Sequence, residues 1–146
     1  MLNLNQITVD IAGVTVLRRI SVTLQAGQTY AVVGRNGAGK TTLLRAIAGL
    51  HPRVEGSVVA DGQDLRGLRA DQIALLGVAL VRESGRLPSS LSVVENLQLG
   101  QRLARLRGKN GRSLEEIWQW FPILQPLQAR KAGLLSGGQR QALALA

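Results

Sequence analysis

The sequence predicts an α/β protein in which strands dominate the first half of the chain and helices dominate Ser92 to Arg130. A glycine-rich segment, Gly34 to Thr42, lies between a short apolar run and a segment with helical periodicity. Apolar and polar residues alternate before it, as they do in half-buried strands. After residue 91, serine and glutamate recur three positions apart, a spacing that is typical of helix starts. These observations together indicate the fold class.

Composition fits a globular protein and excludes several other classes. The 146 residues are 45% hydrophobic, which is enough for one core, and only 3% aromatic, so aliphatic side chains must fill that core. The absence of cysteine excludes disulfides and thiolate metal sites. No apolar run approaches the roughly 18 residues that span a bilayer. The segment Met1 to Gln6 has no signal-peptide pattern.

Charge is strongly basic, with a formal net value of +9. Such a balance suits nucleic acid, anionic lipid or a phosphate-rich ligand. A solvated helix and loop is the simpler interpretation of the densest stretch. That stretch contains Arg102, Arg105, Arg107, Lys109 and Arg112.

The first strands are predicted from the alternation of apolar and polar residues. Leu4 to Val9 and Ser21 to Leu24 alternate apolar with polar residues, and Ala26 to Gln28 is predicted as a turn. Thr29 to Val33 is short, mostly apolar and rich in β-formers. We therefore expect it to be a buried strand that leads into the glycine-rich segment.

A helix, a strand with its turn, a second helix and a further strand are expected next. Helical spacing covers Lys40 to Leu50 and should end near Gly49 and Pro52. The remaining three elements are Ser57 to Ala60 running into an Asp-Gly turn, a short helix at Ala70 to Leu76, and a buried strand at Gly77 to Val81.

The second half begins with a loop and continues as helices. Glycine, proline and serine predict a loop at Glu83 to Ser90. Capping boxes at Ser92 with Glu95 and at Ser113 with Glu116 predict two helix starts. Prolines at 122 and 126 then interrupt the helical pattern.

The glycine-rich segment matches the phosphate-loop pattern G-x-x-x-x-G-K-[ST] in full. Glycines allow the backbone to approach an anion, and the following helix adds its N-terminal partial positive charge. Lys40 would bridge the outer phosphates, Thr41 would ligate Mg²⁺ and Thr42 could donate to a phosphate. A chance glycine-rich turn is the alternative, but the predicted strand before it and helix after it favour nucleotide binding. The predicted ATP-binding residues are Gly34, Arg35, Asn36, Gly37, Ala38, Gly39, Lys40, Thr41 and Thr42.

A second motif, Leu135 to Gln139, reads L-S-G-G-Q. Alone it is another capping box, formed by Ser136 and Gln139. Combined with the phosphate loop about a hundred residues upstream, the chain resembles an ABC-type ATPase, whose signature is this pentapeptide. The resemblance implies that Ser136, Gly137, Gly138 and Gln139 contact ATP held by a partner subunit. It also implies a head-to-tail dimer with ATP and Mg²⁺ at the interface.

Softer segments resemble the ATP-binding subunits of branched-chain amino acid importers and of related urea and amide importers. These segments are Arg82 to Arg86, Leu91 to Leu97, Phe121 to Leu124 and Lys131 to Gly133. The branch carries glutamate at the position of Glu83, where most ABC ATPases have glutamine. The resemblance implies that Glu83 couples the γ-phosphate and Mg²⁺ to the membrane partner.

The chain departs from that branch at several positions. Arg82 replaces a proline, Pro88 a phenylalanine, and Gln139 follows the general consensus where the branch often has glutamate. Ile11 stands where family members place an aromatic residue against adenine. Because an alkyl side chain cannot stack as an aromatic ring does, we expect weaker adenine discrimination without loss of binding.

The resemblance implies a P-loop NTPase fold of ABC type, with an N-terminal antiparallel β portion, a RecA-like core and a helical signature subdomain. We expect residues 1–82 to form the nucleotide-binding core, 83–135 the Q-loop equivalent and helical subdomain, and 136–146 the start of the signature helix. Family members carry the lytic Walker B carboxylates and a switch histidine after that helix. We therefore expect an incomplete core and a chain that is inactive alone, although the full-length protein would be an ATPase.

The expected function is to power import of a small solute, with branched-chain amino acids as the first expectation. Implied partners are a second ATPase subunit, transmembrane permease subunits and, indirectly, a solute-binding protein; no nucleic acid is expected. The implied location is peripheral, on the cytoplasmic face of the inner membrane. Two alternatives stay open: a non-transport ABC ATPase, and a degenerate module that binds ATP without hydrolysing it.

Overall fold

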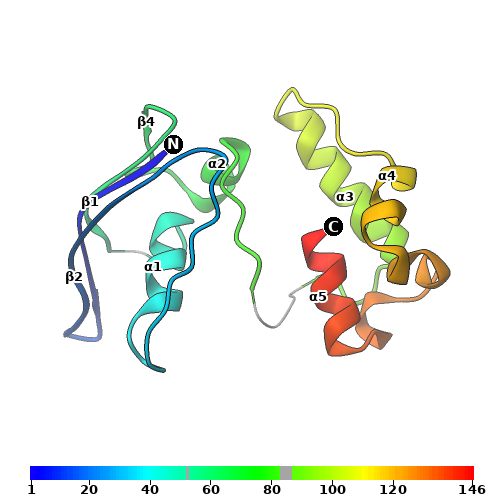
Figure 1. The fold of residues 1–146 in the computed structure, drawn as a ribbon, viewed down its shortest axis with the longest axis horizontal. Helices are drawn as coiled ribbons and strands as arrows, with labels where there is room; N and C mark the ends of the chain where they lie inside the picture. The colour runs from blue at the N-terminus through cyan, green and yellow to red at the C-terminus, as the bar shows by residue number, and fades with distance from the viewer. Residues whose placement is uncertain (52, 83–86) are drawn as a thin grey trace. The chain divides into compact units, whose positions relative to one another are not determined.

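The computed structural model describes residues 1–51, 53–82 and 87–146 and divides into two compact units, Met1–Leu80 and Val81–Ala146 (Figure 1). The first unit contains the β-sheet, and the second is helical. Each unit has its own cluster of buried aliphatic side chains. The units are therefore described separately.

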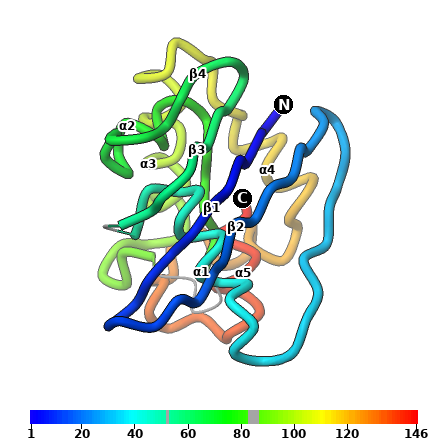
Figure 2. Tube along the Cα trace, turned by 90° about the vertical axis from the view of Figure 1, so that its left-hand side faces the viewer, coloured from blue at the N-terminus to red at the C-terminus, as the bar shows by residue number. Residues whose placement is uncertain are grey.

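One antiparallel sheet organises the first unit. Its strands are β1 (Leu2–Ile11), β2 (Val14–Leu24), β3 (Glu55–Ala60) and β4 (Gln63–Asp64), in the order β2-β1-β3-β4. β1 pairs with β2 on one side and β3 on the other, and Figure 2 shows it running beside β2. The strands predicted in these regions are confirmed, and β1 and β2 are longer than predicted.

Two-residue turns join the strands of both hairpins. Asp61 and Gly62 connect β3 to β4 with φ values of 46° and 85°. Ala12 and Gly13 connect β1 to β2 with φ values of 49° and 80°. Two successive positive φ angles match the right-handed twist of the flanking strands, which is why Asp-Gly favours a hairpin. The predicted turn after β3 is confirmed.

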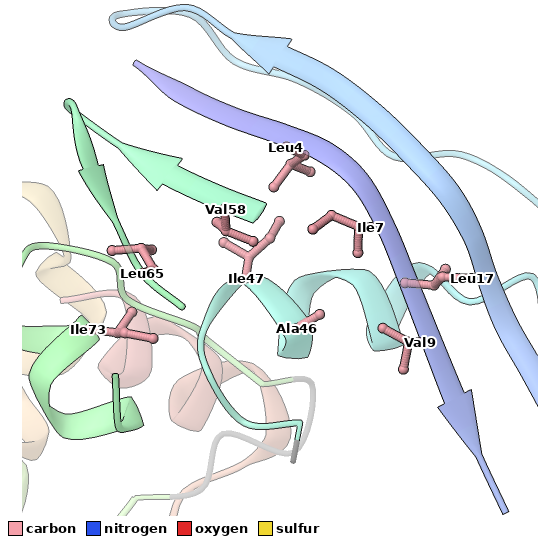
Figure 3. Packing of buried hydrophobic residues seen from close by; sticks show 9 residues of the cluster. All are labelled: Leu4, Ile7, Val9, Leu17, Ala46, Ile47, Val58, Leu65 and Ile73. Atoms are coloured by element: carbon pink, nitrogen blue, oxygen red, sulfur yellow. The ribbon is translucent and has the colours of Figure 1, made fainter. Parts of the chain in front are cut away.

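The core of the first unit lies between the sheet and two short helices. These helices are α1 (Lys40–Ile47) and α2 (Ala70–Leu75), close to the predicted ranges. Figure 3 shows the side chains that form this core, from the sheet, both helices and the segment after β4. The buried residues are Leu4, Ile7, Val9, Leu17, Ala46, Ile47, Val58, Leu65 and Ile73.

Two predicted strands are wrong. Neither Thr29 to Val33 nor Gly77 to Val81 forms a strand, and Val33 is 87% exposed. A buried strand needs neighbouring strands to accept and donate its backbone hydrogen bonds. Among the described residues, the only sheet is the antiparallel one, and neither segment pairs with it.

In the second unit, the described residues form three α-helices and two short 3₁₀ turns, which pack around one aliphatic core. The helices are α3 (Val93–Leu106), α4 (Leu114–Trp120) and α5 (Gly137–Leu145), with 3₁₀ turns at Pro122–Leu127 and Ala132–Leu134. The prolines end regular helix where predicted. None of the helices in the described parts of the chain has the length and apolarity needed to cross a membrane. The core residues are Val93, Leu97, Ile117, Leu124, Ala132, Leu135 and Leu143.

Each of the helices α3, α4 and α5 begins with a reciprocal capping box. At α3, the Ser92 hydroxyl accepts from the Glu95 amide at 3.3 Å, and the Glu95 carboxylate accepts from the Ser92 amide at 2.7 Å. The same pair of bonds begins α4 and α5. Since each box satisfies two amides that lack intrahelical partners, local sequence alone places these helix starts. All three are confirmed.

Candidate nucleotide-binding site

The lysine of the phosphate loop forms hydrogen bonds across the loop to its first residues. The Lys40 ammonium donates to the carbonyl oxygens of Gly34 at 2.8 Å and Arg35 at 2.9 Å. A backbone bond from the Ala38 amide to the Arg35 carbonyl, at 3.1 Å, tightens the turn between them. The loop therefore has a defined shape, with a cation held across it.

The helix that follows this loop begins without a side-chain cap. Its N-cap residue is Gly39, with φ 90°, and no acidic residue lies in the first turn. In contrast, α3, α4 and α5 all start with a serine that accepts an amide hydrogen bond. The first amides of α1 thus lack the side-chain acceptor that the other three have. An anion at this end of α1 would supply that acceptor and interact favourably with the helix dipole.

Glycine is favoured at two positions of the loop for different structural reasons. A Cβ at Gly39 would lie 2.7 Å from Leu17 Cδ2 and 3.3 Å from the Val16 carbonyl, so glycine lets the loop pack on β2. A Cβ at Gly37 would meet nothing within 4 Å, and φ there is 83°. The loop is therefore tightly packed at one glycine and open at the other. Together with Lys40 and the Thr41 hydroxyl, this cradle fits a polyphosphate and its Mg²⁺.

Ile11, the residue predicted to face adenine, ends β1 and is 42% exposed. It pairs with Val14, which lies two residues before Val16, a neighbour of Gly39. The same hairpin therefore carries Ile11 and contacts the phosphate loop. Ile11 also borders a depression with Asp10, Ala12, Gly13, Thr15, His51 and Arg53. Its contact with a base stays a prediction.

Glu83, the predicted coupling residue and Mg²⁺ ligand, lies outside the described residues. Its role therefore stays a prediction. The neighbouring Arg82 is described and lies in an irregular segment.

The signature motif forms the start of α5 in the second unit. Leu135 is buried in the helical core, with 4% exposure, and Ser136 is the N-cap. The Ser136 hydroxyl accepts from the Gln139 amide at 3.3 Å, and the Gln139 side chain accepts from the Ser136 amide at 2.9 Å. Cβ atoms at Gly137 and Gly138 would meet nothing within 4 Å. The motif is thus anchored on one side and open at its two glycines.

Sequence reasoning missed one contact within this motif and one near it. The Arg140 guanidinium donates to the Leu135 carbonyl, and Lys131 pairs with Ser92 in an isolated antiparallel bridge. Nearby, hydrogen bonds from Ser92, with a smaller contribution from the Lys131 charge, lower the pKa of Glu95. The position of Arg140 in the first turn of the helix, shortly after Gly137 and Gly138, was the only sequence signal that could have indicated its contact. The bridge joins positions 39 residues apart, and no local pattern indicates it.

A glycine-rich loop before a helix without a side-chain cap, together with a second helix that begins at Ser136 and two glycines, is the arrangement expected of an ATP-binding cassette. The ABC transporter family model matches residues 17–146. The chain belongs to the ABC transporter family.

Several curated relatives cover most of the chain. It is 31% identical to a high-affinity branched-chain amino acid transport ATP-binding protein, BraG, of Pseudomonas aeruginosa, over 99% of the chain and 62% of that protein. It is 34% identical to a probable branched-chain amino acid transport ATP-binding protein, LivF, of Archaeoglobus fulgidus, over 90% and 55%. A methionine import ATP-binding protein of Legionella pneumophila is 33% identical over 100% and 43%. The chain thus spans less than two thirds of the length of these relatives.

A solved structure confirms the fold. A dimeric ATP-binding cassette in a post-hydrolysis state, bound to ADP and Pi, superposes with a TM-score of 0.79 at 23% identity. The match covers 99% of this chain and 67% of that one. The predicted ABC-type fold, with its N-terminal antiparallel sheet, is therefore confirmed.

Proposed function

We propose that this chain binds ATP with Mg²⁺ at residues 34–42 as the nucleotide-binding part of an ABC transporter. The observation that carries the proposal is the start of α1, where a helix without a side-chain cap follows a glycine cradle crossed by Lys40. Lys40 would exchange its two carbonyl acceptors for phosphate oxygens. Thr41 would ligate Mg²⁺, and Thr42 would donate to a phosphate.

The signature would act on ATP held by a second subunit. Ser136 and the two glycines after it start α5 with an open surface, and the helix dipole favours an anion there. A head-to-tail dimer with two ATP molecules at its interface follows from this role. The second subunit would be another copy or a paralogue.

In the whole protein, ATP binding would bring two subunits together and hydrolysis would separate them. We assign Glu83 to the link between the γ-phosphate, Mg²⁺ and the permease subunits. The subunit would work as a peripheral protein on the cytoplasmic face of the inner membrane. A solute-binding protein would deliver the solute to the permease.

We propose a small solute as the cargo, with branched-chain amino acids as the first candidate. The similarity to BraG and LivF supports this choice. Proteins named for methionine, ribose and arabinose import match at similar identity, and so does one named for Nod factor export, so the similarity supports ABC transport more broadly than it supports one cargo. Uptake of labelled leucine, methionine and ribose in cells with and without the gene would separate these cargoes. Unchanged uptake of all three would contradict the assignment.

The trans arrangement has a direct test in which two defective variants are mixed. Lys40→Ala removes the phosphate contact but keeps an intact signature, whereas Ser136→Arg blocks the signature but keeps an intact loop. Each variant alone should fail to dimerise with ATP, and the mixture should regain an ATP-dependent dimer because one composite site is complete. Sedimentation velocity with and without ATP and Mg²⁺ measures this. If the unaltered protein dimerises but the mixture does not, the proposal that the signature contacts ATP held by a second subunit is contradicted.

A further inference from the structure

Two parallel rows of exposed side chains run along α3 in the helical unit. Leu99, Leu103 and Leu106 are 37%, 52% and 74% exposed and are spaced by four and three residues, so they share one helix face. Arg102 and Arg105 each precede one of these leucines and are also exposed. Adjacent residues lie about 100° apart around a helix, so the basic row borders the leucine row.

The basic row forms a small polar depression. Gln98, Gln101, Arg102 and Arg105 line a shallow hollow of about 310 Å³. Two guanidinium groups and the Gln98 amide on one helix face suit a phosphate group, since guanidinium binds phosphate oxygens with good geometry. The hollow therefore offers an anion site directly beside the exposed leucines.

The charge of this region is unbalanced. Between Glu95 and Glu115 the sequence has five basic residues and no acidic residue. Only Arg112 of the five forms an ion pair within the described parts of the chain, with Glu116 at 3.1 Å. The others, on α3 and in the loop after it, have no such ion-pair partner among the described residues: Arg102, Arg105, Arg107 and Lys109.

The loop that follows α3 is held against the helix. Gln101 donates from its side-chain amide to the Arg112 carbonyl at 2.8 Å, and Gly111 packs so closely on Gln101 that a Cβ would lie 3.1 Å from its Cα. Arg112 also lies over the Trp120 ring, 4.7 Å from its centroid. Backbone bonds from the Arg107 amide to the Leu103 carbonyl at 3.2 Å and from the Lys109 amide to the Ala104 carbonyl at 3.0 Å keep both residues at the C-terminal end of α3, where Leu106 lies.

We propose that this surface, comprising Leu99, Arg102, Leu103, Arg105 and Leu106, binds the headgroup region of an anionic phospholipid bilayer. An apolar row beside a basic row is the pattern of a helix that lies in a membrane interface, with leucines at the acyl boundary and arginines at the headgroups. An acidic protein segment would need the arginines but not three leucines in register with them. This inference does not depend on ATP binding.

Vesicle binding by the full protein tests the proposal. The protein should co-sediment with vesicles of phosphatidylcholine that contain one third phosphatidylglycerol, but not with phosphatidylcholine alone. Each cation near an anionic surface contributes about fivefold to partitioning, so Arg102→Gln with Arg105→Gln should weaken binding about thirtyfold. Raising salt from about 0.1 M to about 1 M should release the protein. Arg18→Gln with Arg130→Gln removes the same charge elsewhere and should retain most of the binding.

A fluorescent probe tests the leucine row separately. The chain has no cysteine, so Leu106→Cys gives a single attachment site for an environment-sensitive dye. Its emission should shift to the blue on anionic vesicles, whereas the same dye at Ala129→Cys, an exposed position elsewhere in this unit, should not change. Far-ultraviolet circular dichroism confirms that each variant is folded.

Two results would overturn the proposal. Equal binding of the arginine and control variants would show that general charge, and not this surface, attracts the vesicles. Binding of a polyglutamate peptide that depends on Arg102 and Arg105, without any vesicle binding, would assign the surface to an acidic protein partner.

Discussion

The Lys40 ammonium lies 2.8 Å from the Gly34 carbonyl oxygen, at the opposite end of the phosphate loop. This contact joins the first and last invariant positions of the phosphate-loop pattern across the turn. A bound phosphate would compete with the carbonyl for the same cation. The lysine therefore holds the shape of the loop and would also be the ligand for the outer phosphates.

Replacing Lys40 should separate binding from stability. Lys40→Ala should weaken ATP binding about a hundredfold or more, since hydrogen bonds to charged groups contribute about 1.5–3 kcal/mol each. The thermal midpoint should change little, because the two loop contacts are exposed and surface substitutions are usually within about 0.5 kcal/mol. Titration with a fluorescent ATP analogue and a melting curve measure the two effects. A large fall in the thermal midpoint with unchanged ATP affinity would show that Lys40 stabilises the fold and does not bind phosphate.

Gly56 should be far less tolerant of substitution than Gly62, although both have positive φ, at 89° and 85°. A Cβ at Gly56 would lie 2.4 Å from the Asn5 carbonyl and 2.6 Å from the Gln6 carbonyl, whereas one at Gly62 would meet nothing within 4 Å. Gly62→Ala should cost about 1–2 kcal/mol for the left-handed backbone. Gly56→Ala should cost about 1–3 kcal/mol more, because β1 and β3 must separate. Urea unfolding measures both, and equal losses would contradict the packing argument.

The helix starts of the second unit were predictable, and the interior of the first was not, for one physical reason. A serine with an acidic residue three positions later makes its own hydrogen bonds, so Ser92 begins α3 from local sequence alone. Strand formation at Thr29 to Val33 depends on neighbouring strands from elsewhere in the chain. The apolar composition of this segment does not indicate whether such strands pair with it. The need for glycine at position 56 likewise comes from carbonyls about fifty residues away in sequence. The phosphate loop was predictable because its chemistry lies in consecutive residues.

Ser136 should have two separable roles, as a helix cap and as a contact for the partner's ATP. Ser136→Ala removes the acceptor for the Gln139 amide and should cost about 1 kcal/mol. Ser113→Ala breaks an equivalent box at α4, with the Glu116 amide at 3.2 Å, and should cost about the same. Only Ser136→Ala should also weaken the ATP-dependent dimer. If both variants dimerise equally, capping alone explains the serine in the signature.

The three capping boxes should respond differently to acid, because two use glutamate and the third uses Gln139. Hydrogen bonds from Ser92 lower the pKa of Glu95 below its ordinary value of 4.5, and those from Ser113 do so for Glu116. A lowered pKa in the folded state stabilises the fold above the unfolded pKa, and that stabilisation is lost as pH falls through the folded value. Between about pH 5 and pH 3, the first-turn amides of α3 and α4 should therefore exchange faster relative to their intrinsic rates, while those of α5 should not. Glu95→Gln should remove the acid response at α3 alone. Hydrogen exchange measured at each amide tests this, and equal acid sensitivity at all three helix starts would show that the carboxylates are not the cause.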